Sequence, residues 1–115
     1  MNYKYGEFSQ SQIAQIKERL RKQIFFLLLI VDRATADEYK EVNVNDAFDS
    51  ILSTIGGFNE LLNCPVEIVT ILSLLEAAHL EYQSENFKFK KYRKLILDAG
   101  NEVLNIKEVT DNAEP

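Results

Sequence analysis

The chain has 115 residues, with 13 basic and 18 acidic side chains and a formal net charge of −5. This length is typical of one domain whose core is large enough to fold without disulfides or a structural metal. With 46% hydrophobic residues, four glycines and two prolines, the composition excludes a disordered or collagenous chain and disfavours a turn-rich β-sandwich. We therefore expect one all-α domain over residues 1–115.

The first predicted helix covers about residues 9–33. Ser9 or Ser11 can cap its start, and apolar residues recur at steps of three and four along it. In residues 24–31 the remaining faces are apolar too, so this segment must be covered on every side. A run of 8 apolar residues is too short to cross a bilayer, which takes ~20.

Residues 34–44 are predicted to be a connection, and the second helix runs from about 45 to 63. Asn45 is the expected N-cap, followed by acidic side chains that complement the helix dipole. Gly56 and Gly57 lie in the middle of this helix. Because two glycines cost ~2 kcal/mol there relative to alanine, we expect either a kink or the close crossing of another backbone.

The third predicted helix covers about residues 65–83, with Pro65 in its first turn, and the fourth covers about 87–107 with Asn86 as its cap. Residues 110–115 are expected to fray. Short connections favour a compact bundle of four helices in up-and-down antiparallel packing. A break at Gly56–Gly57 or at Gly100 would make five.

Two segments carry more apolar surface than a four-helix bundle requires. The third helix is apolar around most of its circumference, and so is the second half of the first. Two explanations remain open: the third helix is the central, buried helix, or the first helix forms a subunit interface. In the second case a homodimer would use Phe25, Phe26, Leu29 and Ile30.

The modest net charge hides two opposed blocks. Residues 34–85 hold one basic and ten acidic residues, whereas residues 86–97 hold five basic residues and no acidic one. The basic block could bind nucleic acid or pair internally with the acidic block, and a pI of about 4.9 disfavours nucleic acid. Its candidate contact residues are Lys88, Lys90, Lys91, Arg93 and Lys94.

The acidic block predicts a protein-binding surface. Its connection and helix start combine carboxylates, which raise association rates, with aromatic side chains, which supply binding hot spots. Small acidic helical proteins that neutralise basic nucleases, such as immunity proteins, use the same physics. The alternative is that the carboxylates only serve the helix dipole and solvate a loop. The candidate residues are Asp37, Glu38, Tyr39, Glu41, Asp46, Phe48 and Asp49.

Catalytic signatures are weak. Cys64 and His79 are single and lie far apart on a continuous helix, so we expect no enzyme and interpret Cys64 as a buried apolar residue. Glu76 and His79 have the Glu-x-x-His spacing of di-iron bundles, but one copy is present. We therefore expect a buried polar pair, with no metal and no cofactor.

These observations favour a non-enzymatic, cytoplasmic protein that binds a basic protein, as an inhibitor or immunity protein does. The single cysteine is consistent with a reducing compartment. The first alternative is a self-assembling structural or adaptor protein with an interface on the first helix. The second is a nucleic-acid accessory protein that uses the basic block.

Overall fold

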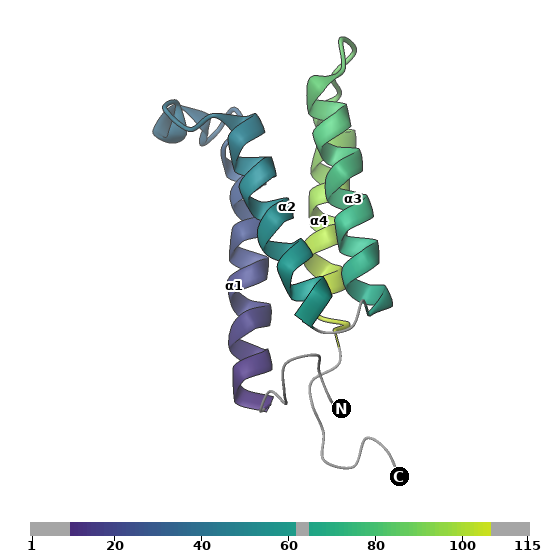
Figure 1. Cartoon of the computed structure of the whole chain (residues 1–115). Coiled ribbons are helices and arrows are strands. Elements are labelled where there is room, and N and C mark those ends of the chain that lie inside the picture. The colour runs from purple at the N-terminus through teal and green to yellow at the C-terminus, as the bar shows by residue number, and fades with distance from the viewer. Residues whose placement is uncertain (1–9, 62–64, 107–115) are drawn as a thin grey trace.

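The computed structural model describes residues 10–61 and 65–106. Helices α1 and α2 run in opposite directions, as do α3 and α4, so the bundle is up-and-down and antiparallel (Figure 1). The prediction of an all-α four-helix bundle is confirmed, and neither glycine site divides a helix. The elements are α1 (Gln10–Leu29), the 3₁₀ helix η1 (Ala36–Tyr39), α2 (Val44–Leu61), α3 (Val66–Gln83) and α4 (Phe89–Val103).

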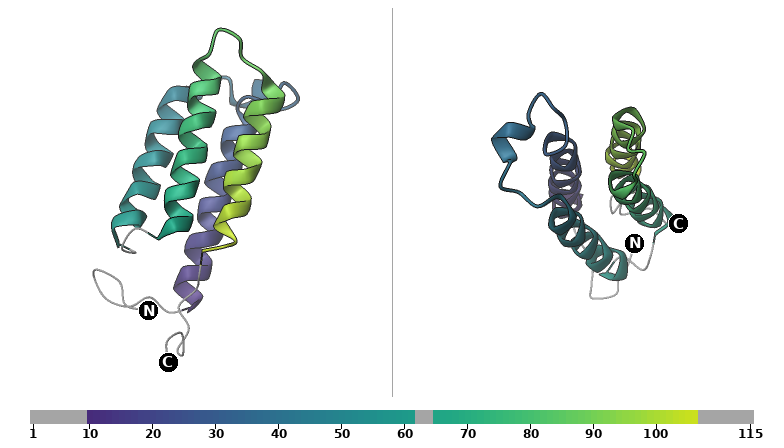
Figure 2. Two further views of the ribbon diagram at one scale, coloured as in Figure 1. Left: turned by 90° about the vertical axis from the view of Figure 1, so that its right-hand side faces the viewer. Right: turned by 90° about the horizontal axis from the view of Figure 1, so that it is seen from above.

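Each helix packs against two neighbours. Helices α1 and α3 both contact α2 and α4, so they lie diagonally across the bundle, as the view from above shows (Figure 2). The α1–α4 face and the α2–α3 face are therefore opposite sides of the molecule. The apolar seam predicted for the first helix is buried, and all four helices contribute fully buried side chains, including Leu20, Leu27, Phe48, Ile55, Ile71, Leu75, Tyr92 and Ile96.

Helix α1 ends at Leu29, before the predicted Arg33, because local side-chain bonds compete with the next helical turn. The hydroxyl of Thr35 donates to the Leu29 carbonyl at 2.6 Å, and the carboxylate of Asp32 accepts from the Ala34 amide at 2.9 Å. These bonds turn the chain out of the helix towards η1.

The two predicted N-caps are wrong by a few residues. Helix α2 is capped by Asn43, whose Oδ1 accepts from the Asp46 amide at 2.9 Å, and Asn45 already lies inside the helix. The amide of Asn86 donates to Ser84 Oγ at 3.1 Å in the turn before α4, so Asn86 is not a cap. Sequence alone could not choose between Asn43 and Asn45, which lie two residues apart.

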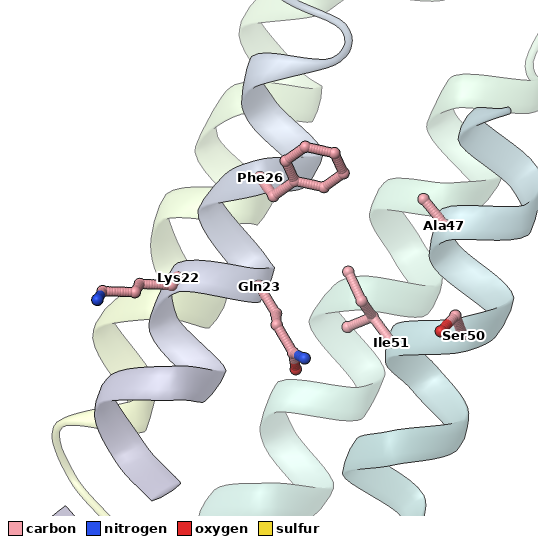
Figure 3. A pocket seen from close by; sticks show the side chains of 6 residues that line it. All are labelled: Lys22, Gln23, Phe26, Ala47, Ser50 and Ile51. Atoms are coloured by element: carbon pink, nitrogen blue, oxygen red, sulfur yellow. The ribbon is translucent and has the colours of Figure 1, made fainter. Parts of the chain in front are cut away.

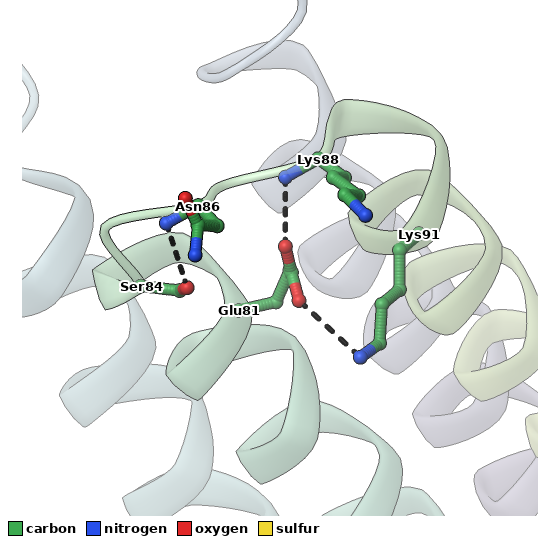
Figure 4. A network of polar contacts seen from close by, with 5 residues as sticks. All are labelled: Glu81, Ser84, Asn86, Lys88 and Lys91. Atoms are coloured by element: carbon green, nitrogen blue, oxygen red, sulfur yellow. Dashed lines mark hydrogen bonds and ion pairs between the residues drawn. The ribbon is translucent and has the colours of Figure 1, made fainter.

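Helix α4 is capped at its N-terminal end by a side chain of another helix. Glu81 of α3 accepts from the Lys88 amide at 2.7 Å through Oε2, and its Oε1 lies 3.5 Å from Lys91 Nζ (Figure 4). A nearly buried carboxylate at a helix N-terminus satisfies free amides and complements the dipole.

The C-terminal end of α4 is capped by cations of α1. Lys17 Nζ donates to the Ile106 carbonyl at 2.9 Å, and Arg21 Nε donates to the Gly100 carbonyl at 3.2 Å. The Gly100 carbonyl is free for this bond because the Leu104 amide donates to Asn101 instead. Part of the charge pattern seen in the sequence thus serves helix ends.

The glycine that another residue approaches closely is Gly100, against which the Phe25 side chain packs, and not Gly56 or Gly57. An ideal Cβ at Gly100 would lie 2.4 Å from ring atoms of Phe25, whereas none of the described neighbours comes within 4 Å of such an atom at Gly56 or Gly57. Helix α2 continues through both glycines. The prediction of a close crossing at Gly56–Gly57 was therefore wrong.

Helix α3 is not a central, buried helix. Its inward face carries Ile68, Ile71, Leu75 and Ala78, but large apolar side chains on its outward face remain exposed. A bundle of four helices has no position surrounded on all sides, so the excess apolar surface of α3 stays at the surface.

Candidate protein-binding surface

The five carboxylates predicted to bind a partner all lie at the surface. Asp37 and Glu38 belong to η1, Glu41 follows it, and Asp46 and Asp49 lie in the first two turns of α2. All five are exposed, and within residues 10–61 and 65–106 none of them forms an ion pair. We call these five residues the acidic surface; it lies at the end of the bundle where α1 leads into α2 (Figure 1).

The two predicted aromatic anchors differ in their exposure to solvent. Tyr39 is half-buried and its ring meets Phe26 of α1 edge-on, with centroids 5.3 Å apart. Phe48 is fully buried, stacked on His79 at 4.4 Å, so it is a core residue and cannot contact a partner. The prediction was wrong for Phe48 because the sequence did not show which face of α2 meets α3.

The predicted buried pair of Glu76 and His79 does not form. Glu76 is exposed on the outward face of α3. The Nε2–H of His79 instead donates to Asn45 Oδ1 of α2 at 2.8 Å, and Gln83 Nε2 donates to the same oxygen at 3.2 Å. A polar cluster of three residues therefore joins α2 to α3 beside the acidic surface. Sequence reasoning did not identify Gln83 and assigned Asn45 to a helix cap.

Most residues of the subunit interface predicted on the first helix instead pack against other parts of the same chain. Ile30 is buried in the core, Phe26 packs on Tyr39, and the ring of Phe25 lies over Gly100 with Arg21 Cζ 5.1 Å from its centroid. Only Leu29 of the four is exposed, at 38%. The interface as predicted is therefore wrong for Ile30.

All five cations of the basic block are exposed. Lys91 pairs with Glu81, which lies in the acidic block of the sequence, and Lys94 pairs with Asp98 at 2.9 Å. The aromatic residues between them do not form a free stacking platform, because Tyr92 is fully buried and Phe87 and Phe89 pack against it. Nucleic-acid binding by this block stays a prediction.

A groove between α1 and α2 was not predicted. It encloses about 330 Å³, and Figure 3 shows Gln23 of α1 directed towards Ile51 and Ser50 of α2, with Phe26 and Ala47 nearby. The Oε1 atom of Gln23 is buried without a hydrogen-bond partner among the described residues. Such a groove depends on how two helices align, which residue patterns do not specify.

In residues 10–61 and 65–106 no group of three or more His, Cys, Asp and Glu side chains could hold a metal ion. No helix in that part of the chain combines the length and the apolar character needed to span a membrane. Cys64 and the tail at residues 110–115 lie outside the described residues, so the predictions for them are not addressed.

No family model, no curated protein and no solved structure matches the chain. The interpretation of its function therefore rests on the residues and geometry described above.

Proposed function

We propose that this protein is a non-enzymatic binding protein whose acidic surface docks onto a basic protein. The role that we infer is neutralisation of a toxin or nuclease, as an inhibitor or immunity protein performs it. The observation that carries the proposal is that Asp37, Glu38, Glu41, Asp46 and Asp49 are exposed and unpaired in the described residues. We place the protein in the cytoplasm, where a single cysteine remains reduced.

Electrostatics supports this proposal. The sequence has no Lys or Arg between Lys40 and Lys88, so few internal cations can neutralise the acidic surface. Unpaired charges of one sign on one surface steer an oppositely charged protein and raise its association rate. Carboxylates serving the helix dipole alone would occupy only the first turn of α2, whereas three of these five lie before α2 begins.

Tyr39 is the best candidate for an apolar anchor in this surface. Its ring is fixed against Phe26, so little side-chain entropy remains to be lost, and its half-buried position leaves part of it accessible. Tyrosine is enriched at interface hot spots. Phe48, being buried, does not contribute.

The test is affinity capture by the immobilised full chain from a lysate of the source organism, followed by calorimetry with the purified captured protein. We expect a basic protein whose affinity falls at least tenfold on charge reversal of Asp37, Glu38 and Glu41 to Lys, and falls with added salt. The matched control reverses Glu18, Glu60 and Glu85, three exposed carboxylates outside the acidic surface. Capture of an acidic protein, or equal binding by both variants, would contradict the proposal.

A further inference from the structure

The outward face of α3 carries three large apolar side chains that no other described helix covers. Val66, Val69 and Leu80 are 70%, 44% and 68% exposed, and with Ser73 and Glu76 they follow one another at steps of three and four residues. Residues at this spacing share one side of a helix. We call these five residues the α3 stripe. Ser73 and Glu76 interrupt the apolar surface between Val69 and Leu80, so the stripe is a mixed surface with three large exposed apolar side chains. Exposed apolar side chains gathered on one side and rimmed by polar ones mark interaction sites in soluble proteins.

The charge around the α3 stripe has one sign. Helices α2 and α3 together carry six acidic residues and neither Lys nor Arg. Helices α1 and α4 together carry eight basic and three acidic residues. Because α2–α3 and α1–α4 are opposite sides of the bundle, the molecule has a negative side and a positive side.

The positive side has a groove that matches the stripe. It encloses about 420 Å³ between α1 and the end of α4, with apolar walls from Phe25 and Leu104. Its charged lining is three cations, Lys17, Arg21 and Lys22, and one carboxylate, Glu18, which lies 3.7 Å from Lys22 Nζ, so the groove has a net positive charge. Leu104 is 55% exposed. We call this the α1–α4 groove. The negative side of the molecule thus exposes apolar side chains among carboxylates, and the positive side carries an apolar groove bordered mainly by cations.

We propose that the protein self-associates by placing the α3 stripe of one copy in the α1–α4 groove of the next. Leu80 would lie against Phe25 and Leu104, and Glu76 would face the groove cations. Val66 and Val69 lie ~16–21 Å from Leu80 along α3 and would extend along α1 towards Ala14, which also lines the groove. The contact is heterologous, so repeating it yields a ring or a filament and not a two-fold dimer.

The available area is sufficient for a specific contact. Two adjacent helices of 18 residues form a side ~27 Å long and ~20 Å wide, from a rise of 1.5 Å per residue and a diameter of about 10 Å. The resulting flat projection is ~540 Å² per partner, or ~1,080 Å² for both partners, which is at the low end of specific interfaces and in the range of weak, transient contacts. The proposed contact residues of the α3 stripe are not those of the acidic surface, although Asp46 and Asp49 add to the negative charge of the same side, and the proposal does not rest on the proposed function.

The experiment measures mass by light scattering and sedimentation against protein concentration, with two double variants of the full chain. The stripe variant is Glu76→Lys with Leu80→Lys, and the groove variant is Lys22→Glu with Leu104→Glu. All four positions are exposed, so both variants should fold, which circular dichroism checks. Lys40→Glu and Glu85→Lys, at exposed positions outside both surfaces, are the charge-reversal controls; each changes the net charge by two, against three for the double variants.

We expect the natural chain to exceed its monomer mass of 13.2 kDa as concentration rises, and to dissociate with added salt because screening weakens surface charge attraction. Each double variant should associate at least tenfold more weakly, and the controls should match the natural chain. An equimolar mixture of the two variants should form a 1:1 complex, because each retains the surface that the other has lost.

Two results would overturn the proposal. One is a natural chain that remains a monomer up to about 1 mM, the limit of weak association. The other is self-association that survives in either variant alone, or that the mixture fails to restore, since a two-fold contact or an unrelated surface would then be responsible.

Discussion

The hydroxyl of Tyr92 in α4 donates a 2.6 Å hydrogen bond to the main-chain carbonyl of Leu27 in α1. Leu27 lies in the last turn of α1, where carbonyls lose their helical partners. The amide of Val31, four residues on, donates to Leu28 instead. A buried side chain from the first turn of α4 therefore caps the C-terminal end of α1 and ties these two helices together.

Replacing Tyr92 with Phe should lower the free energy of unfolding by about 1–2 kcal/mol at neutral pH. The ring would still fill its site, but the Leu27 carbonyl would be buried without a partner, which costs ~1–3 kcal/mol. Denaturant unfolding followed by circular dichroism measures the loss. Tyr39→Phe is the matched control, because the hydroxyl of this half-buried tyrosine forms no hydrogen bond within the described residues. Equal stability of the two variants would show that the Tyr92 bond contributes nothing.

The stabilisation of the folded state by Tyr92 should depend on pH under alkaline conditions. Burial, with a smaller contribution from nearby Tyr82, raises the pKa of Tyr92 well above its ordinary value of 10.0. The folded state therefore holds this proton more tightly than the unfolded state does. The stabilisation is complete below about pH 10 and is lost as pH rises towards the folded-state value. The difference in unfolding free energy between the natural chain and Tyr92→Phe should accordingly begin to shrink above about pH 10, and a difference that stays constant as the pH rises past this value would contradict the linkage.

Glu81 should contribute more to stability than its partner Lys91. Glu81 is 9% exposed and accepts from a helix-terminal amide, whereas Lys91 is 67% exposed. Hydrogen bonds to charged groups contribute ~1.5–3 kcal/mol, and surface ion pairs ~0–1 kcal/mol. We expect Glu81→Ala to cost about 2 kcal/mol, Glu81→Gln less, and Lys91→Ala under about 1 kcal/mol in denaturant unfolding. Glu85→Ala, an exposed neighbour, should change little, and a larger loss from Lys91 than from Glu81 would contradict the capping role.

The helices could be predicted from the sequence, and the helix contacts could not. Apolar steps of three and four residues identify each helix, since that spacing places side chains on one face. The exposed carboxylates of the acidic surface follow from the same patterns. By contrast, the burial of Phe48 and the bond from His79 to Asn45 depend on which face of α2 meets α3. Gly100 likewise has no sequence signal that distinguishes it from Gly57.

Alanine substitution at Gly57 and at Gly100 should change the free energy of unfolding in opposite directions. At Gly57 the position is exposed and open, so alanine should raise the free energy of unfolding by up to about 1 kcal/mol through helix propensity. At Gly100 the new Cβ would lie 2.4 Å from Phe25 ring atoms, and overpacking costs ~1–3 kcal/mol. We expect a net loss of about 1 kcal/mol there. In a Phe25→Leu background the loss at Gly100 should become a gain, and an unchanged loss would exclude the ring as its cause.

Alanine substitution should lower the free energy of unfolding much more at His79 than at Glu76, although the two residues are only three positions apart on α3. His79 stacks on the buried ring of Phe48 and donates to Asn45, so His79→Ala removes a packing contact and leaves the Asn45 oxygen with Gln83 alone. We expect a loss of about 1–2 kcal/mol in thermal or denaturant unfolding, from one hydrogen bond and part of an aromatic contact. Glu76→Ala removes an exposed side chain and should stay within about 0.5 kcal/mol of the natural chain. His79→Gln, which keeps a donor, should recover part of the loss. Similar losses at Glu76 and His79 would instead support a direct pairing of the two side chains.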